Sequence, residues 1–281
     1  MCIRDRLFTN HLLAFNNYVP PLEIQSEFHT TYESEKNILK SDCPILKRKC
    51  KGTIQWKNSD HYKGAIRFGK PHGIGTYNWS DGTIYNGSFD TGVPHGFGKK
   101  SYVDGSVYEG DWWDGMKHGE GAYSFSCGDE YYGEFQYDLM EGEGTILFGS
   151  GESYSGNWKN NQPEGYGIFS RNDGSQYAGN SHKGMKDGDG MVIWETGDTL
   201  KGNWAEGKLE DDATLIFNDG STMISFWDNG ESQDELTYIT SDGEEYQGNQ
   251  KELAAIIISQ DFDRIETVEN NLQLALSLIH I

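Results

Sequence analysis

The stretch that decides the fold is YEGDWWDGMKHGEG at residues 108–121, which repeats the pattern of YNGSFDTGVPHGFG at residues 85–98. The two stretches begin 23 residues apart, and the same period continues along the chain without insertions. A fixed period of this length predicts a repeat protein, in which each unit packs on its neighbours. The repeats start at Tyr62, Tyr85, Tyr108, Tyr131, Tyr154, Tyr177, Leu200, Met223 and Tyr246.

Most repeats open with alternating residues, in which an aromatic, a glycine and an aromatic occupy the first, third and fifth positions, and Ser181 and Ser225 are departures from the pattern. Alternation with period two predicts a β-strand with one buried face, and polar residues such as Lys63, Glu109 and Asp111 then lie on the other face. The buried positions are Tyr62 and Gly64; Tyr85, Gly87 and Phe89; Tyr108, Gly110 and Trp112; Tyr131, Gly133 and Phe135; Tyr154, Gly156 and Trp158; Tyr177 and Gly179; Gly202 and Trp204; and Trp227.

A second strand follows each first strand after a glycine-rich turn, as in DGMKHG at residues 114–119. Each repeat is therefore predicted to be a β-hairpin. Glycines inside strands cost conformational entropy, and we expect them to leave room for a neighbouring aromatic ring to lie flat across the backbone. The tyrosine, tryptophan and glycine columns should then interlock.

The segments outside the periodic region differ in pattern. Residues 1–51 have no periodicity and predict loop or short helix, residues 52–61 match half a repeat, and residues 62–248 form the array. Apolar residues three and four apart in residues 249–281 predict an amphipathic helix. This helix either folds over the last hairpin or binds a partner. The terminal hexapeptides, MCIRDR and LSLIHI, resemble translated adapter sequence, so native and adapter-derived ends are both open interpretations.

The two quoted stretches resemble the MORN (membrane occupation and recognition nexus) repeat, and the resemblance is clear from Tyr62 to about Gly207. It implies an all-β fold, an elongated single-layer antiparallel meander of 23-residue hairpins. With strands about 4.8 Å apart, nine repeats would extend on the order of 85 Å. The resemblance also implies roles in cytoskeletal, ciliary and membrane-associated assemblies, in phospholipid binding, or as segments attached to lipid-phosphate kinases.

Charge and cysteine content narrow the classes of partner and compartment. The formal net charge is −21, which argues against nucleic acid and disfavours anionic membranes, because both require a concentrated positive surface. The four cysteines show neither the density of a disulfide scaffold nor a CxxC pair, so free thiols and a cytoplasmic location are predicted.

No pattern in the chain predicts catalysis, a cofactor or a metal. His72, His95 and His118 recur at one turn position, but equivalent residues of adjacent hairpins are about 9 to 10 Å apart, which favours turn structure over metal binding. The DGDG segment at residues 187–190 lacks the spacing of a calcium loop. The basic cluster at residues 47–51 is interpreted as a solvated linker, with headgroup binding or nuclear import as the alternative.

Three hypotheses about function follow from these observations. The favoured one is a non-catalytic scaffold whose partners are other proteins, located in the cytoplasm with cytoskeletal or membrane association. The second is a phospholipid-binding tether making weak lipid contact, and the third is a regulatory segment of a larger enzyme. Homodimerisation through the terminal helix or the end of the array is a further expectation.

Overall fold

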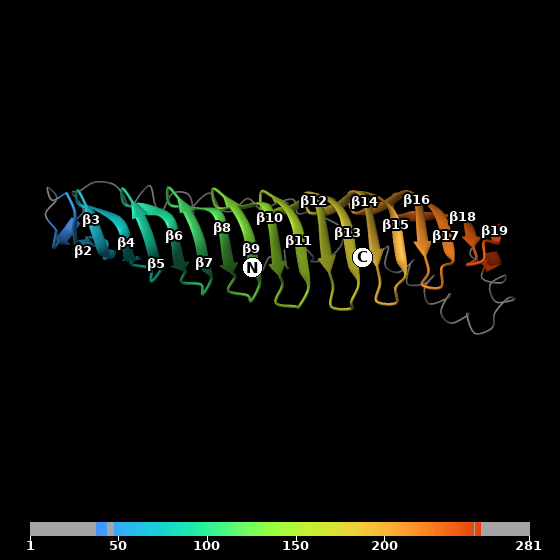
Figure 1. Ribbon diagram of the computed structural model, residues 1–281, viewed down its shortest axis with the longest axis horizontal. Coiled ribbons are helices and arrows are strands. Elements are labelled where there is room, and N and C mark those ends of the chain that lie inside the picture. The colour runs from blue at the N-terminus through green and yellow to red at the C-terminus, as the bar shows by residue number, and fades with distance from the viewer. Residues whose placement is uncertain (1–37, 44–47, 250, 254–281) are drawn as a thin grey trace. The chain divides into compact units, whose positions relative to one another are not determined.

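The computed structural model describes residues 38–43, 48–249 and 251–253, and almost all of them belong to antiparallel β-strands or their turns (Figure 1). The strands are β1 (Ile38–Ser41), β2 (Cys50–Trp56), β3 (His61–Arg67), β4 (Lys70–Asn78), β5 (Ile84–Asp90), β6 (Val93–Ser101), β7 (Val107–Trp113), β8 (Met116–Ser124), β9 (Glu130–Gln136), β10 (Leu139–Leu147), β11 (Ser153–Lys159), β12 (Gln162–Ser170), β13 (Gln176–His182), β14 (Met185–Ile193), β15 (Thr199–Ala205), β16 (Lys208–Ile216), β17 (Thr222–Asp228), β18 (Glu231–Ile239) and β19 (Glu245–Gly248). The predicted all-β meander of hairpins is confirmed.

The described residues divide into two compact units. The N-terminal unit runs to Gly149 and includes Trp158–Asn161, and the C-terminal unit contains Ser150–Asn157 and the residues from Gln162 onward. In the N-terminal unit each strand from β1 to β10 pairs with the next along the chain. The same order runs from β12 to β19 in the C-terminal unit. Both units are therefore open meanders.

Two-residue turns join the strands within each repeat. Both residues of every such turn between Phe68 and Gly230 have positive φ, for example 49° at Asp114 and 84° at Gly115. Positive φ at both central positions is the type I′ geometry, which matches the twist of the flanking strands and is favoured by Asn, Asp and Gly. These turns define one edge of each unit, which we call the turn edge.

A bulge follows each tight turn and explains why the second strand of a repeat is longer than the first. In the pair of β7 and β8, Gly110 faces Gly121 while Trp112 faces Lys117. One residue of β7, Asp111, thus lies opposite three residues of β8, and Gly119 in this bulge has a φ of 63°. The His-Gly and Glu-Gly pairs of the sequence occupy this bulge.

Wider loops join consecutive repeats at the opposite edge, the loop edge. The amide of Trp79 donates to the carbonyl of Thr83 at 2.9 Å, and the Asp81 carboxylate accepts the amide of Thr83 at 2.7 Å. The buried carboxylate of Asp60 accepts hydrogen bonds from the Tyr77 hydroxyl at 2.9 Å and from the Ser80 amide at 2.8 Å. A buried acid in one loop therefore fixes the next loop along the unit.

The core of the C-terminal unit changes from aromatic to aliphatic toward its end. Leu200 and Met223 replace the first tyrosine of the repeat, and both lie in one cluster with Trp204, Trp227 and Leu253. Residues 251–253 are helical, and Leu253 is 1% exposed. The rest of the predicted helix at 249–281 lies outside the described residues.

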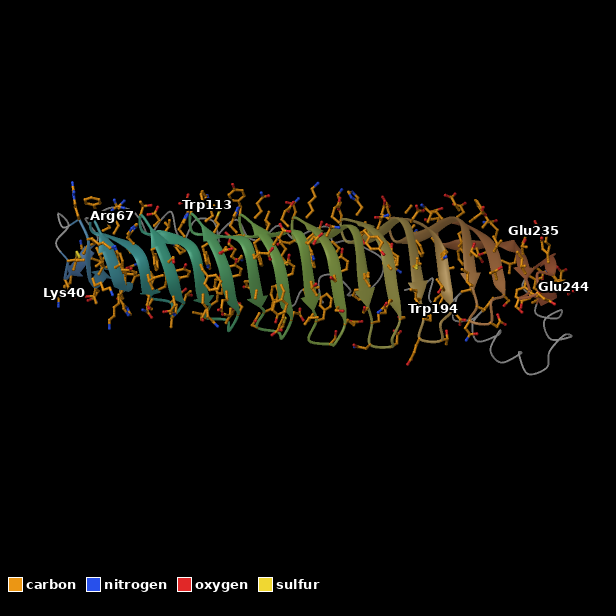
Figure 2. All side chains as sticks on the ribbon, in the orientation of Figure 1. Lys40, Arg67, Trp113, Trp194, Glu235 and Glu244 are labelled. Atoms are coloured by element: carbon orange, nitrogen blue, oxygen red, sulfur yellow. A yellow bond between two sulfur atoms is a disulfide. The ribbon has the colours of Figure 1, made fainter. Side chains whose placement is uncertain are left out.

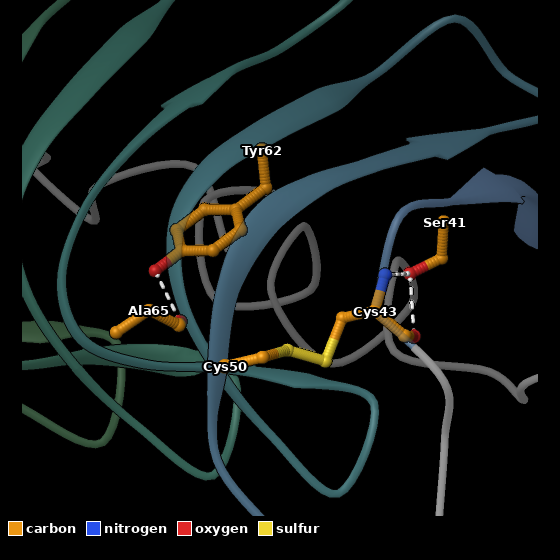
Figure 3. The surroundings of a disulfide bond; sticks show 5 residues. All are labelled: Ser41, Cys43, Cys50, Tyr62 and Ala65. Carbon is orange, nitrogen blue, oxygen red and sulfur yellow. Dashed lines mark hydrogen bonds between the residues drawn. A yellow bond between two sulfur atoms is a disulfide. The ribbon is translucent and has the colours of Figure 1, made fainter. Parts of the chain in front are cut away.

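The N-terminal end of the meander begins before the predicted partial repeat. The sequence of residues 38–41 lacks periodicity, yet these residues form β1 and pair with β2. Cys43 and Cys50 form a disulfide beside this pair (Figure 3), so the prediction of free thiols is wrong here. Cys127 is not a free thiol either. The two paired cysteines are seven residues apart, and this spacing matches no pattern that predicts a disulfide.

Candidate interaction surface

The tyrosine at the first position of each repeat packs flat against two glycines. A Cβ atom on Gly110 would lie 2.5 Å from the Cα of Gly121, and one on Gly121 would lie 2.5 Å from the Tyr108 ring. The Tyr108 hydroxyl donates to the carbonyl of Asp111 at 2.9 Å. The same bond holds Tyr62, Tyr85, Tyr131, Tyr154 and Tyr177. Burial raises the pKa of the Tyr62 and Tyr154 hydroxyls to about 12.

The aromatic at the fifth position links one tyrosine to the next from Tyr62 to Tyr131. The Trp112 ring contacts Tyr85 and Tyr108 edge-to-face at centroid distances of 5.2 and 5.1 Å, and Tyr108 contacts Phe135 at 5.1 Å. The Trp112 Nε1–H donates to the carbonyl of Gly98 at 3.0 Å. Edge-to-face contacts of this kind add stability beyond the buried area.

Every aromatic side chain that the sequence singled out at a repeat position lies in this interior. The exposed fraction is 7% or less for Tyr62, Tyr85, Phe89, Tyr108, Trp112, Tyr131, Phe135, Tyr154, Trp158, Tyr177, Trp204 and Trp227. Paired strand glycines lie against the tyrosine rings at Gly64, Gly87, Gly110, Gly133, Gly156 and Gly179, whereas Gly202 lies against Leu209. These residues build the fold and leave no surface of their own for a partner.

Two lysines enter the same interior at a position that proline or methionine fills in other repeats. Lys117 Nζ lies 5.0 Å from the Tyr123 ring centroid and 3.8 Å from the Asp138 carboxylate. Lys186 Nζ lies 5.0 Å from the Tyr177 centroid, and burial lowers the pKa of its ammonium group to about 8. The sequence pattern did not predict that these lysines enter the interior, because a basic residue at this position is expected to face solvent.

Acidic side chains hold consecutive turns together along the turn edge. The Glu164 carboxylate accepts the amide of Lys183 at 3.0 Å and lies 3.0 Å from Nδ1 of His182. Three other acids accept an amide from the next turn in the same way: Glu141, Asp187 and Glu210. In the earlier repeats histidine occupies the position of these acids. The change from histidine to an acid therefore replaces the ring contacts of histidine by a hydrogen bond to the next turn.

The histidines at this position in the N-terminal unit make different contacts. His72 Nδ1 lies 3.1 Å from the Asp90 carboxylate. His95 stacks on Trp113 at 4.6 Å, and His118 lies between Trp113 and Tyr137 at 6.4 and 5.1 Å. Among the residues that the structure describes, no three His, Cys, Asp or Glu side chains are grouped so as to hold a metal ion.

These contacts create a row of rings at the turn edge, which we call the ledge: His95, Trp113, His118 and Tyr137. Trp113 is 52% exposed and Tyr137 is 49% exposed. Trp113 and Arg67 project from the same edge in Figure 2. The sixth position of a repeat is polar elsewhere in this unit, as at Asp90 and Gln136, so the tryptophan at position 113 departs from the repeat pattern and is a sequence signal for this surface.

Carboxylates surround the ledge on the face of the sheet opposite the buried tyrosines, which we call the outer face. Glu120 and Glu134 face each other directly across β8 and β9, where like charges repel. Residues 84–143 contain twelve acidic and three basic residues. Lys99 pairs with Glu109 at 2.9 Å, and Lys100 is buried with its ammonium group over Trp79 and Tyr102. The outer face near the ledge is therefore strongly negative.

The geometry of interlocked 23-residue hairpins agrees with a match to a known family. The model of the MORN repeat matches six consecutive stretches at residues 62–84, 85–107, 108–129, 131–153, 154–176 and 177–199. Residues 62–199 belong to the MORN repeat family. The MORN repeats account for the tyrosine and glycine columns, and the later hairpins from β15 onward continue the same geometry beyond the matched stretch. No curated protein matches the sequence.

Several solved structures resemble the MORN-repeat chain weakly. The TCP10 domain of Danio rerio CPAP has a TM-score of 0.40 and 14% identity, covering 70% of this chain and 98% of that domain. The G-box domain of the microcephaly protein CPAP has a TM-score of 0.37 and 14% identity, covering 61% and 96%. The SAS-4 TCP domain of Drosophila melanogaster, solved with a proline-rich motif of Ana2, has a TM-score of 0.30 and 9% identity, covering 63% and 85%. At these TM-scores the likenesses carry no argument about function.

The MORN repeats indicate a repeat protein for interaction with proteins or membranes. No helix within the described part of the chain has the length and apolar content needed to cross a membrane. Among the described residues, the exposed aromatic and apolar side chains include the ledge and residues of the outer face such as Ile74, Phe97 and Tyr132, at 70%, 60% and 46% exposed.

Proposed function

We propose that this MORN-repeat chain is a non-catalytic scaffold that organises a cytoskeletal, ciliary or membrane-associated assembly by binding other proteins. The observation that carries the proposal is the combination of an interlocked interior with large apolar side chains exposed on the outer face. Buried aromatics such as Tyr108 hold the backbone, while Phe97 and Tyr132 present their rings to solvent. Exposed aromatic and apolar side chains on a rigid support are typical of interaction surfaces.

Phospholipid binding is the second candidate, because exposed aromatic side chains can also contact a membrane interface. The net charge of −21 opposes binding to anionic lipids, since the surface potential of such membranes attracts basic segments. The third hypothesis, a regulatory segment of a larger enzyme, and the cytoplasmic location stay predictions. So does the division of the chain into an irregular segment at residues 1–51, a partial repeat at 52–61, a repeat array at 62–248 and a helical tail at 249–281.

The scaffold is tested by capturing partners with the full chain and with a variant carrying Phe97→Ser and Tyr132→Ser. Both changes replace exposed rings on the outer face, so circular dichroism should show an unchanged sheet. The matched control carries Lys63→Ser and Asn86→Ser at exposed polar positions of the same unit. Cross-linking mass spectrometry of the retained proteins should show contacts to the outer face that disappear in the aromatic variant only.

Sedimentation with vesicles separates the two candidates. A scaffold should stay in the supernatant with both neutral and anionic vesicles, whereas a lipid tether should sediment with anionic vesicles and be released by salt. Equal protein capture by wild type, aromatic variant and control would overturn the scaffold proposal for this surface. Sedimentation without any cross-linked protein would establish the tether in its place.

A further inference from the structure

The ledge formed by His95, Trp113, His118 and Tyr137 has the chemistry of a cation-binding surface. We propose that it binds an extended, arginine-bearing segment of a partner protein, with guanidinium groups stacked on the ledge rings. The inference rests on the proposed scaffold function and assigns the surface and the class of partner. Its evidence is ring exposure, local charge and the spacing of the repeats.

The rings of the ledge follow one another along the turn edge. The centroids of His95, Trp113, His118 and Tyr137 follow one another at 4.6, 6.4 and 5.1 Å, so they form a continuous strip across three repeats. Trp113 and Tyr137 are each about half exposed. A guanidinium group is planar, weakly hydrated and stacks on aromatic faces, and tryptophan is the strongest partner for it.

The chain itself contains this type of contact at another turn of the same unit. The Cζ atom of Arg67 lies 5.5 Å from the ring centroid of Phe68, which occupies the turn of its repeat. Within the described residues, no arginine or lysine lies over Trp113 or Tyr137. Among the described residues, no cation therefore covers the ledge rings in the way that Arg67 covers Phe68.

Charge complementarity selects a basic occupant rather than an apolar one. Asp111, Asp114, Glu120 and Glu134 are exposed beside the ledge, and the nearby lysine Lys117 points into the interior toward Asp138. Binding an arginine-bearing segment would relieve the repulsion between the facing Glu120 and Glu134 carboxylates. A lipid with an anionic headgroup, or a second copy of this acidic chain, would add negative charge to the same surface.

The repeat spacing predicts the register of the arginines. Equivalent positions of adjacent hairpins are separated by two strands, or about 9.6 Å. A polyproline II segment advances about 3.1 Å per residue, so every third side chain returns to the same side after about 9.3 Å. Arginines three residues apart can therefore meet successive repeats along the ledge, whereas a β-strand places alternate side chains about 6.6 Å apart.

The test measures fluorescence anisotropy of a labelled peptide of sequence RPPRPPRPP added to the full chain. One control peptide has the same composition in the order RRRPPPPPP, and a second has citrulline, which is neutral, in place of each arginine. The protein variants are Trp113→Ala and Tyr137→Ala, with Tyr166→Ala as the matched control. Tyr166 is an exposed ring of the C-terminal unit, 55% accessible and remote in sequence from the ledge.

We expect RPPRPPRPP to bind and each ledge variant to weaken binding by about tenfold, since each removes one cation–aromatic contact. Tyr166→Ala should bind as wild type does, the citrulline peptide should not bind, and added salt should weaken binding. Equal weakening by Trp113→Ala and Tyr166→Ala, equal binding of the citrulline peptide, or no binding of RPPRPPRPP would overturn the ledge site. Equal affinity for the clustered peptide would overturn the register.

Failure of this inference differs from failure of the scaffold. If cross-links to the outer face persist in Trp113→Ala while the peptide does not bind, the scaffold stands and the ledge site is wrong. If the ledge variants lose peptide binding, while the wild-type chain sediments with anionic vesicles and cross-links to no captured protein, the proposed function is wrong and the ledge is still a peptide site. Circular dichroism of each variant verifies that exposed-ring substitutions leave the sheet intact.

Discussion

The phenol ring of Tyr108 occupies the space into which a Cβ atom of Gly121 would project, at 2.5 Å from the ring. The relationship recurs for Tyr62 with Gly75 and for Tyr131 with Gly144. Tyrosine and glycine are therefore one structural unit, in which the missing side chain of one residue is replaced by the ring of the other. The conformational cost of glycine in a strand is offset by this packing.

Substituting Gly121 by alanine should destabilise the N-terminal unit. The new methyl group must displace the Tyr108 ring, so we expect the free energy of unfolding to fall by about 1 to 3 kcal/mol. Gly52→Ala is the matched control, because a Cβ there meets only ordinary contacts at 3.4 and 3.6 Å. Urea midpoints of the two variants measure the difference, and equal midpoints would contradict the interlock.

Alkaline pH should unfold the chain steeply. Burial raises the pKa of Tyr62 and Tyr154 from 10.0 to about 12, so the folded state retains protons that the unfolded state releases. Their contribution to stability is complete below pH 10 and is lost as the pH rises toward 12. Tyrosinate absorbance and circular dichroism should change together above pH 10. Ionisation of these tyrosines near pH 10 without unfolding would contradict their burial.

The hairpins could be predicted from the sequence because their causes are local. Alternation placed Tyr108 and Trp112 on one face, and strand glycines such as Gly121 indicated a ring packed on bare backbone. The disulfide between Cys43 and Cys50 could not be predicted, because it depends on β1, a strand formed by residues without periodicity. Register between a non-periodic strand and the array is a tertiary property.

The candidate surface was less predictable than the interior. Trp113 looked like one more aromatic of a repeat, although it lies one position beyond the buried Trp112 and therefore points to the opposite face. Tyr137 occupies a turn position usually given to polar residues or glycine. Trp113 and Tyr137 both contact His118, so these rings join two repeats. Contacts between repeats depend on the register of the paired strands, which the repeat pattern alone does not give.

Replacing Lys186 by methionine should stabilise the C-terminal unit at neutral pH. Burial lowers the lysine pKa from 10.5 to about 8, so the folded state binds the proton less tightly and pays a cost below pH 8. The gain from Lys186→Met is at most about 3 kcal/mol and fades as the pH rises from 8 toward 10.5. Met140 already fills the equivalent position of another repeat at 6% exposure.

Thermal melts of Lys186→Met and wild type at pH 7 and pH 9 measure this effect. Lys117→Met is the comparison, because Lys117 has the Asp138 carboxylate 3.8 Å away and its removal leaves that acid without its ion pair. We expect a smaller gain for Lys117→Met. A melting temperature for Lys186→Met equal to or below that of wild type at pH 7 would show that the ammonium group is better solvated than its position indicates.

Asp138 joins two repeats through its side chain, and its replacement should test how the turn edge is held. Its carboxylate accepts the backbone amide of Lys117 at 2.9 Å, and its own amide donates to the Lys117 carbonyl at 3.0 Å. Asn161 makes the same pair of bonds with Met140 in the next repeat. Where proline occupies the repeat position of Lys117, as Pro94 does, there is no backbone amide that needs an acceptor. The turn residue facing Pro94 is Gly115, which has no side-chain acceptor and donates its amide to the Pro94 carbonyl.

Asp138→Asn should therefore lower the free energy of unfolding less than Asp138→Ala does, because asparagine loses the charge that faces Lys117 but keeps the acceptor oxygen and tolerates the φ of 71° at this position. Asp138→Ala should lower it by about 1 to 3 kcal/mol, since the Lys117 amide loses its partner and alanine is strained at positive φ. Asp138→Gly separates the two causes by relieving the strain alone. Equal stability of the asparagine and alanine variants would mean that water satisfies the amide and that the turn edge is held by backbone bonds only.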